Sequence, residues 1–310
     1  MTPQSNTTSS QTLIVLVGPT AIGKTQLCLD IAQRLDTEIV SADSRQIFKE
    51  MKTGTAAPAP KQLRQVVHHF VGSHSIFEYY TAGMFEMEAL ERLQEIFRRK
   101  KQVLMTGGSG LYISAVCHGI DALPKVDPDV RKNLLNQYEQ EGLQGMRQRL
   151  KMLDPKSYEQ IDLMNPKRIL KALEITLTTG KPYSAFLTRQ KKHRPFRILK
   201  IGLNRQREEL YRRINQRVDQ MLEEGLLEEA RQLYPYKHLN ALNTVGYKEL
   251  FSYFHGDISL QEATRLIKRN TRRYAKRQLT WFSKDPEIQW FHPQNYHEIL
   301  NYILNLSAKR

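Results

Sequence analysis

The sequence predicts an α/β fold in which helices flank a parallel sheet and one helical domain is inserted. Two observations indicate the sheet: short apolar runs are typical of buried strands, and segments with helical periodicity separate them. These runs occupy residues 13–17, 38–41, 103–106 and 197–203. A third observation indicates the insertion, because residues 121–195 are polar, rich in helical pattern and without a strand-like run. We therefore expect a core formed by residues 12–120 and 196–310 and a helical insertion at residues 121–195.

The composition excludes several classes of protein. Residues 1–11 are rich in Ser, Thr, Gln and Asn and lack the charged and apolar regions of a signal peptide, so they are expected to form a disordered tail. No apolar run approaches the ~18 residues that a membrane span requires. Cys28 and Cys117 fall in apolar segments without metal-ligand spacing, which excludes a disulfide scaffold. We expect a soluble, monomeric protein of the reducing cytoplasm, with no membrane partner.

The eight residues after the first apolar run form a phosphate-binding motif, the P-loop. They are Gly18, Pro19, Thr20, Ala21, Ile22, Gly23, Lys24 and Thr25. A helix follows, so backbone N–H groups and the positive end of that helix can surround phosphate groups. Lys24 would reach a terminal phosphate, and the Thr25 hydroxyl would hold Mg²⁺. The alternative is an incidental glycine-rich turn, and the motif alone does not identify the reaction.

Local signals set the expected ends of the other helices. Thr81 is placed to cap a helix that continues to residue 100. Within the insertion, Asn165 begins a helix and Gly180 ends it. A capping box at Ser259 begins a long helix that runs to about residue 281.

Polar residues beside the predicted sheet are candidates for a functional site. Asp43 follows the second apolar run, and ligands of parallel sheets bind at the carboxyl ends of the strands, so Asp43 is expected beside the P-loop. Residues 208–224 predict an amphipathic helix on which Arg213 and Arg217, four residues apart, share a face. The two arginines could converge on one anion, although two solvated arginines are the commoner outcome of such spacing.

The chain is strongly basic, with 47 Lys and Arg against 32 Asp and Glu and a formal net charge of +15. The last long helix contains no acidic residue between Glu262 and Asp285, and aromatic residues interleave with its cations. The cations are Arg265, Lys268, Arg269, Arg272, Arg273, Lys276 and Arg277. This pattern favours a nucleic-acid groove, with another anionic partner or simple solubility as the alternative.

The P-loop by itself favours an ATP-using kinase or NTPase. However, no apolar strand clearly ends in a metal-holding Asp of the Walker-B kind, and a small-molecule kinase does not need a cationic helix of this kind. A loop that binds phosphates can equally hold a diphosphate that leaves. Lys24, the loop amides, Mg²⁺ on Thr25 and the arginine pair would then stabilise the charge on the departing group.

Several motifs together resemble the bacterial tRNA dimethylallyltransferases, also called isopentenyl-tRNA transferases. The motifs follow the family's order from residue 13 to about residue 285, and together they are far more specific than the P-loop alone. They occupy residues 18–25, 41–48, 54–56, 107–112, 180–182, 245–247 and 276–282. The resemblance implies a P-loop NTPase-like core and Mg²⁺-dependent transfer of a dimethylallyl group. The group passes from dimethylallyl diphosphate to N6 of adenosine 37, beside the tRNA anticodon.

The resemblance also implies roles for single residues. Asp43 matches the family's general base, and Thr20 matches a residue near the reacting centre and the leaving oxygen. Arg213 and Arg217 lie in the segment that the family uses on the diphosphate, and which of them makes the closer contact stays open. The adenine amine is a poor nucleophile because its lone pair is delocalised, so base assistance and in-line positioning are expected to supply most of the acceleration.

The target adenine is expected to leave the anticodon loop and enter a channel whose other end admits the diphosphate. The resemblance implies that the insertion grips the anticodon stem, although for Lys167, Arg168 and Lys171 a solvated helix turn is an equal explanation. The positions that match the family's tRNA contacts are Asp43, Ser44, Arg45, Gln46, Ser109, Arg131, Lys167, Arg168, Ile169, Leu170, Lys171, Asn243, Thr244, Val245, Gly246, Tyr247, Lys248, Lys276, Arg277, Gln278, Leu279, Thr280, Trp281, Phe282 and Ser283.

The sequence departs from the family's pattern in two respects. Ser109 stands where family members commonly carry Thr, and the zinc finger of the eukaryotic relatives has no counterpart, which indicates a bacterial type. A prenyltransferase of the same fold acting on free adenine nucleotides is one alternative, but it needs neither the insertion nor the cationic helix. The other is an ATP-dependent kinase or RNA-binding NTPase, which would not use dimethylallyl diphosphate.

Overall fold

The computed structural model describes residues 11–188 and 190–308. The chain divides into two compact units: unit 1 holds the described residues up to Cys117 and from His193 onward, and unit 2 spans His118–Lys192. Unit 2 overlaps the expected insertion, and both of its boundaries lie slightly earlier in the chain. The expected disordered tail lies outside the described residues except for Gln11, whose carbonyl accepts the Arg197 N–H at 2.9 Å.

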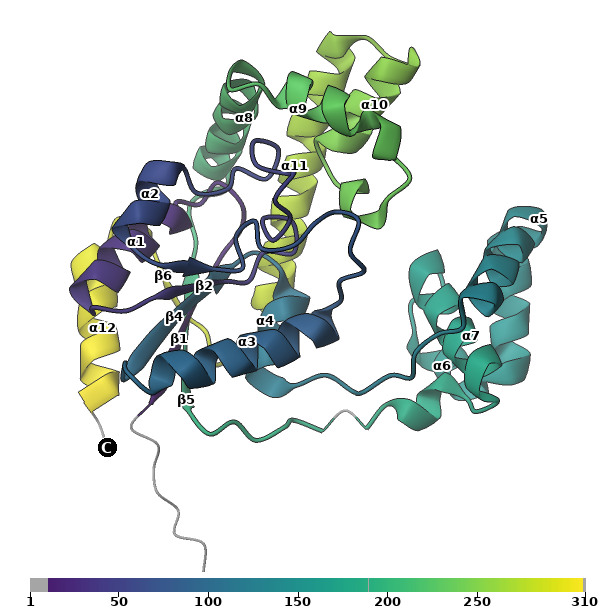
Figure 1. Ribbon diagram of the computed structural model, residues 1–310, viewed down its shortest axis with the longest axis horizontal. Helices are drawn as coiled ribbons and strands as arrows, with labels where there is room; N and C mark the ends of the chain where they lie inside the picture. Colours follow the sequence, from purple (N-terminus) through teal and green to yellow (C-terminus); the bar gives the residue numbers. More distant parts are fainter. Residues whose placement is uncertain (1–10, 189, 309–310) are drawn as a thin grey trace, which may run out of the picture. The chain divides into compact units, whose positions relative to one another are not determined.

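Unit 1 is built on a parallel sheet, which confirms the prediction (Figure 1). In the described part of the chain, six strands are ordered β3-β2-β4-β1-β5-β6, and every neighbouring pair is parallel. The strands are β1 (Thr12–Val17), β2 (Ile39–Ser41), β3 (His68–His69), β4 (Gln102–Gly107), β5 (Arg197–Leu203) and β6 (Gln289–Phe291). The two edge strands were not predicted, because two or three residues are too short to carry a periodic signal.

Helices cover both faces of this sheet. The helices of unit 1, with α4 continuing to His118, are α1 (Lys24–Arg34), α2 (Pro60–Gln65), α3 (Ala82–Phe97), α4 (Gly110–His118), α8 (Arg207–Glu223), α9 (Leu226–Leu233), α10 (Tyr247–His255), α11 (Leu260–Phe282) and α12 (Tyr296–Ala308), and short 3₁₀ turns lie at Tyr234–Tyr236 and Asn240–Leu242. Successive strand residues point to opposite faces. Leu13 and Val15 therefore pack with α3 and α4, whereas Ile14 and Leu16 pack with α1 and α12.

Two of the predicted helix starts, those of α3 and α11, lie in unit 1, and both are confirmed. The Thr81 hydroxyl accepts the Met84 N–H at 3.2 Å, and the Ser259 hydroxyl accepts the Glu262 N–H at 3.1 Å. Helix α3 ends at Phe97 rather than at residue 100, because the chain must turn there to enter β4.

Unit 2 is helical, with α5 (Pro128–Leu153), α6 (Pro155–Gln160), α7 (Pro166–Thr179) and a 3₁₀ turn at Tyr183–Phe186. Its core is a cluster that includes Leu134, Met146 and Ile169. The predicted ends of α7 are confirmed: the Asn165 side chain accepts the Arg168 N–H, and Gly180 adopts the left-handed conformation that ends helices.

The sequence also led us to expect no membrane span and two unpaired, buried cysteines. In the described ranges, no helix has the length and apolarity needed to cross a lipid bilayer. Cys28 and Cys117 are free and buried, as predicted, and burial raises the pKa of their thiols to about 11 and about 12. Both therefore act as small apolar side chains near neutral pH.

Candidate active site

Unit 1 contains a cleft of about 970 Å³ at the carboxyl ends of β1, β2 and β4. The cleft is lined by residues 20–25 of the P-loop, by residues 43–46 after β2, and by Gly107 and Gly108 at the end of β4. Arg213 and Arg217 of α8 and Arg277 of α11 line it as well. The parallel-sheet rule thus placed Asp43 correctly beside the P-loop.

The P-loop conformation depends on the small residues that the motif supplies. Gly23 has φ +108°, a left-handed value that a side chain rarely tolerates, and it is the N-cap residue before α1. Lys24 folds back over the loop, and its Nζ donates to the carbonyls of Gly18 and Pro19 at 2.8 Å each. The pKa of Lys24 is lowered from 10.5 to about 8, chiefly by burial and also by the charge of Arg217, while Asp43 opposes both effects.

The two predicted arginines meet in the cleft. Arg213 Nε donates to the Ala21 carbonyl of the P-loop at 2.9 Å, and Arg217 Nη2 donates to the Thr55 carbonyl at 3.4 Å. Burial lowers the pKa of Arg217, and the positive charge of Arg213 acts in the same direction. Both side chains face the cleft instead of bulk solvent, so their spacing reflects a shared site.

A third arginine at the P-loop was missed by the sequence analysis. Arg205 Nε donates to the Ile22 carbonyl at 3.0 Å, and the Arg205 side chain, 7% exposed, pairs with Glu209. Arg205 follows β5, which lies next to β1 in the sheet. The rule that placed Asp43, applied to the end of residues 197–203, could have found Arg205.

Asp43 is held by its own turn. Its Oδ1 accepts the backbone N–H groups of Arg45 at 2.9 Å and Gln46 at 3.3 Å. Its charge raises the pKa of Arg217 against the effect of burial. The carboxylate therefore lies in the cleft among cations, with Oδ1 fixed by two amides.

Gln278 joins three of the motifs. Its Oε1 accepts the Thr20 N–H and its Nε2 donates to the Gly108 carbonyl, both at 2.9 Å. A Cβ atom on Gly108 would lie 2.2 Å from Gln278 Nε2, so a side chain at this position would displace the Gln278 amide from its hydrogen bonds. Gln278 is 6% exposed, and its side chain orients the P-loop around Thr20.

The structure corrects three of the expected tRNA contacts. The side chains of Ile169, Tyr247 and Phe282 are at most 3% exposed and do not line the cleft, so they pack inside their units and are not available to RNA. Gln278 is 6% exposed and lines the cleft. Apolar and aromatic residues of a motif can serve the core as readily as a ligand, and the sequence alone did not distinguish the two.

The other positions expected to contact tRNA divide between the two units. In unit 1, the cleft-lining members are Asp43, Ser44, Arg45, Gln46, Asn243, Thr244, Val245, Gly246, Lys248 and Arg277. Exposed or half-buried members outside the lining are Ser109, Lys276, Leu279, Thr280, Trp281 and Ser283. In unit 2, Lys167 and Arg168 are exposed and Leu170 is half-buried. Arg131 and Lys171 both pair with Glu174, at 3.6 and 3.8 Å.

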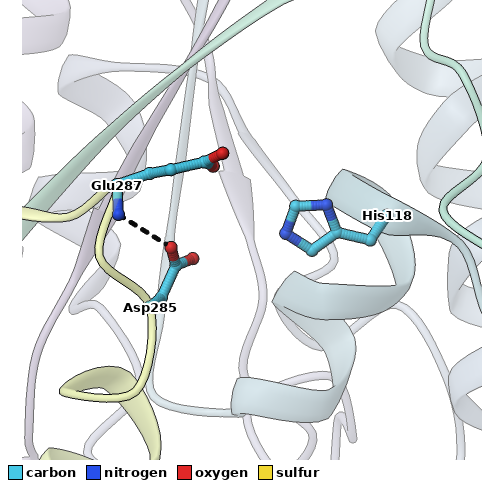
Figure 2. Close-up of side chains that lie close together, drawn as sticks. All are labelled: His118, Asp285 and Glu287. Atoms are coloured by element: carbon cyan, nitrogen blue, oxygen red, sulfur yellow. Dashed lines mark hydrogen bonds between the residues drawn. The ribbon is translucent and has the colours of Figure 1, made fainter.

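Oxygen ligands for a metal ion are present in the cleft. Thr25 lies in the first turn of α1, and both Thr25 and Asp43 line the cleft. Hydroxyl and carboxylate oxygens suit Mg²⁺, which takes much of its coordination from substrate phosphates and water. Asp285 and Glu287 lie close together outside the cleft, and the Glu287 N–H donates to Asp285 Oδ1 at 3.0 Å (Figure 2). Lys200 Nζ donates to both at 2.7 Å, so they tie β5 to the segment before β6.

The chain is similar to known proteins over nearly its whole length. A family model described as IPP transferase matches residues 46–285. The tRNA dimethylallyltransferase 1 of Bacteroides thetaiotaomicron is 55% identical over 292 residues, which cover 94% of this chain and 95% of that protein. The tRNA dimethylallyltransferase of Christiangramia forsetii is 53% identical over 295 residues, 95% of this chain and 98% of that protein.

Solved structures show the same similarity. The tRNA isopentenylpyrophosphate transferase of Bacillus halodurans superposes with a TM-score of 0.71 at 36% identity, covering 96% of this chain and 97% of that one. A eukaryotic dimethylallyltransferase acting on tRNA superposes with a TM-score of 0.76 at 25% identity, covering 95% of this chain and 80% of that one. These similarities confirm the P-loop NTPase-like fold and the resemblance stated from the motifs. The chain therefore belongs to the IPP transferase family, the prenyl-transferring tRNA dimethylallyltransferases.

Proposed function

We propose that this protein transfers the dimethylallyl group of dimethylallyl diphosphate to N6 of adenosine 37 in tRNA and releases diphosphate. The observation that carries the proposal is the single cleft that holds the P-loop, Asp43 and the arginine pair. The cations can bind the diphosphate, and Asp43 offers a base within the same space. We further propose that the enzyme acts in the cytoplasm, where tRNA is available, and as a monomer.

The diphosphate would occupy the P-loop. Lys24, Arg213 and Arg217 are fixed donors there, and donors that need not reorganise stabilise charge as it develops on a leaving group. We propose Thr25 as a Mg²⁺ ligand beside the phosphates. When bound, Mg²⁺ would add Lewis-acid stabilisation of the diphosphate charge.

In the proposed reaction, a bond forms between adenine N6 and the allylic carbon while the carbon–oxygen bond to the diphosphate breaks. The N6 proton passes to the Asp43 carboxylate, and the electron pair of the broken bond leaves on the diphosphate. Thr20 is proposed to lie near the leaving oxygen, where Gln278 would hold its backbone in place. Positioning the two reactants in line supplies much of the acceleration.

We expect the affinity for the donor to fall about tenfold between pH 7 and pH 9, because only protonated Lys24 attracts the diphosphate. The pKa of Lys24 is about 8 in the free protein, and a bound anion favours the charged form. The attraction is therefore nearly complete at pH 7 and is lost as the pH rises through the pKa of Lys24. The measurement is the dissociation constant of an unreactive thio analogue of the donor. A Lys24→Arg variant should lose this dependence, and a constant affinity in the unmodified protein would contradict the assignment.

The cationic helix α11 supports a tRNA surface beside the cleft. Part of its charge is internally paired: Arg265 pairs with Glu262 at 2.6 Å and Lys268 pairs with Asp219 at 2.5 Å. Within residues 11–188 and 190–308, no carboxylate pairs with Arg273, Lys276 or Arg277. These three cations remain available to phosphates. We propose that unit 2, as the predicted insertion, binds the anticodon stem through the exposed Lys167 and Arg168.

Replacing Lys276 by alanine should weaken tRNA binding and reduce the slope of log affinity against log salt by about one, the loss of one phosphate contact. The matched control is Arg265→Ala, because Arg265 lies on the same helix but is already paired. Filter binding of an anticodon stem-loop at several salt concentrations measures both slopes. Equal slopes for the Lys276 variant and the unmodified protein would exclude this part of α11 from the tRNA surface.

Mass spectrometry of nucleosides tests the whole proposal. An unmodified anticodon stem-loop with adenosines at positions 36, 37 and 38 is incubated with the protein, Mg²⁺ and dimethylallyl diphosphate. The expected product carries one added dimethylallyl unit on adenosine 37. Modification of AMP without RNA would favour a free-nucleotide prenyltransferase, and RNA-stimulated ATP hydrolysis without any prenylated product would favour an NTPase.

A further inference from the structure

The backbone of the loop at residues 52–54 is bound by a single carboxylate. Glu229 of α9 accepts three consecutive backbone N–H groups. Its Oε2 accepts those of Lys52 at 2.9 Å and Thr53 at 2.8 Å, and its Oε1 accepts that of Gly54 at 2.8 Å. Charge-assisted bonds of this kind are about twice as strong as neutral ones, so they hold the loop firmly.

A buried tyrosine completes the carboxylate's contacts. Tyr247 donates its hydroxyl to Glu229 Oε1 at 2.7 Å, and its side chain is 0% exposed. The ring lies so close to the loop that a Cβ atom on Gly54 would be 2.5 Å from it. Burial raises the pKa of Tyr247, and the charge of Glu229 raises it further, so the hydroxyl stays a donor. The expected tRNA contact at Tyr247 is thereby replaced by a contact inside unit 1.

The next residue of the loop faces the cleft. The Thr55 carbonyl accepts Arg217 Nη2 at 3.4 Å and Gln46 Nε2 at 3.2 Å. Gly54 and Thr55 line the cleft, whereas Glu229 and Tyr247 are not among its lining residues. Glu229 itself does not line the cleft, so it can affect the cleft only through the backbone of this loop.

Arg217 needs such an anchor. Burial lowers the pKa of its guanidinium, Asp43 raises it and Arg213 lowers it, so charges of both signs act on this side chain. In the free protein, a long side chain under opposing forces keeps one position only where it also has a fixed acceptor. A carbonyl on a rigid loop supplies that acceptor and keeps the guanidinium in the cleft.

We propose that Glu229, together with Tyr247, is a positioning residue for the transfer reaction. It fixes residues 52–55 so that the Thr55 carbonyl holds Arg217 in place for the diphosphate. The inference rests on the proposed role of Arg217 in diphosphate binding. It gives Glu229, which the motif analysis did not single out, a part in catalysis without contact to either substrate.

The test is a double-mutant cycle between Glu229→Gln and Arg217→Ala. Gln at position 229 would put an NH₂ group against backbone donors, and we expect kcat/KM for dimethylallyl diphosphate to fall about tenfold, below the ~100-fold cost of a 1 Å displacement. In the Arg217→Ala background the same change should have little further effect, because the group that Glu229 positions is gone. Tyr247→Phe keeps the ring and removes one bond, so it should give a smaller loss of the same kind.

Glu228→Gln is the matched control, since Glu228 is the neighbouring residue and its side chain is 65% exposed. All assays are run well below the melting temperature of each variant, so that lost folding does not imitate lost positioning. Full kcat/KM in Glu229→Gln, or an equal loss in both backgrounds, would overturn the inference. An Arg217→Ala variant with unchanged donor kinetics would instead overturn the proposed role of Arg217.

Discussion

Replacing Asp43 by asparagine should lower turnover by about 10² or more, the scale for losing a general base. The asparagine oxygen can still accept the Arg45 and Gln46 N–H groups that now bond to Asp43 Oδ1. The turn is therefore retained while the proton acceptor is lost. The KM for dimethylallyl diphosphate should not rise, because the substitution removes a negative charge from a cleft that binds an anion.

Single-turnover rates at saturating anticodon stem-loop measure this effect without product release. Asp36→Asn is a suitable control, since the Asp36 side chain is 93% exposed and lies on the surface. An unchanged rate in Asp43→Asn would refute the assignment of the base. An unchanged rate constant with weaker tRNA binding would assign Asp43 to RNA contact instead.

Removing Arg217 should have an effect of similar or larger size. We expect Arg217→Ala to lower kcat by about 10²–10³, the cost of losing one fixed donor to a developing negative charge. A second consequence follows from the charges in the cleft. Because Arg217 lowers the pKa of Lys24, its removal should move the alkaline limit of donor binding above pH 8.

The pH profile distinguishes a charge in the cleft from a general loss of structure. Arg212→Ala is the matched control, because Arg212 precedes Arg213 on α8 and is exposed. It should retain the kinetics and the pH profile of the unmodified protein. Loss of rate in Arg217→Ala with an unmoved alkaline limit would show that Arg217 does not act on Lys24.

Tertiary contacts changed the interpretation of several motif residues. From the sequence, Gln278 and Tyr247 were expected to contact tRNA, as was the exposed Lys276. In the structure Gln278 bridges Thr20 and Gly108, and Tyr247 binds Glu229 beneath Gly54. Both residues come from helices distant in sequence from the loops that they hold. A motif shows which residues belong together, but the path of the chain decides which of them face a ligand.

The sequence by itself determined the parallel sheet, the P-loop, the place of Asp43 and the caps at Thr81, Asn165 and Ser259. Each of these depends on local pattern: apolar runs for strands, side-chain oxygens for caps, and the rule for strand ends. Only the tertiary structure decided that Arg205 joins the P-loop and that Glu229 holds residues 52–54. Those contacts join residues more than 170 positions apart, and their formation depends on how helices pack on the sheet, which no local pattern records.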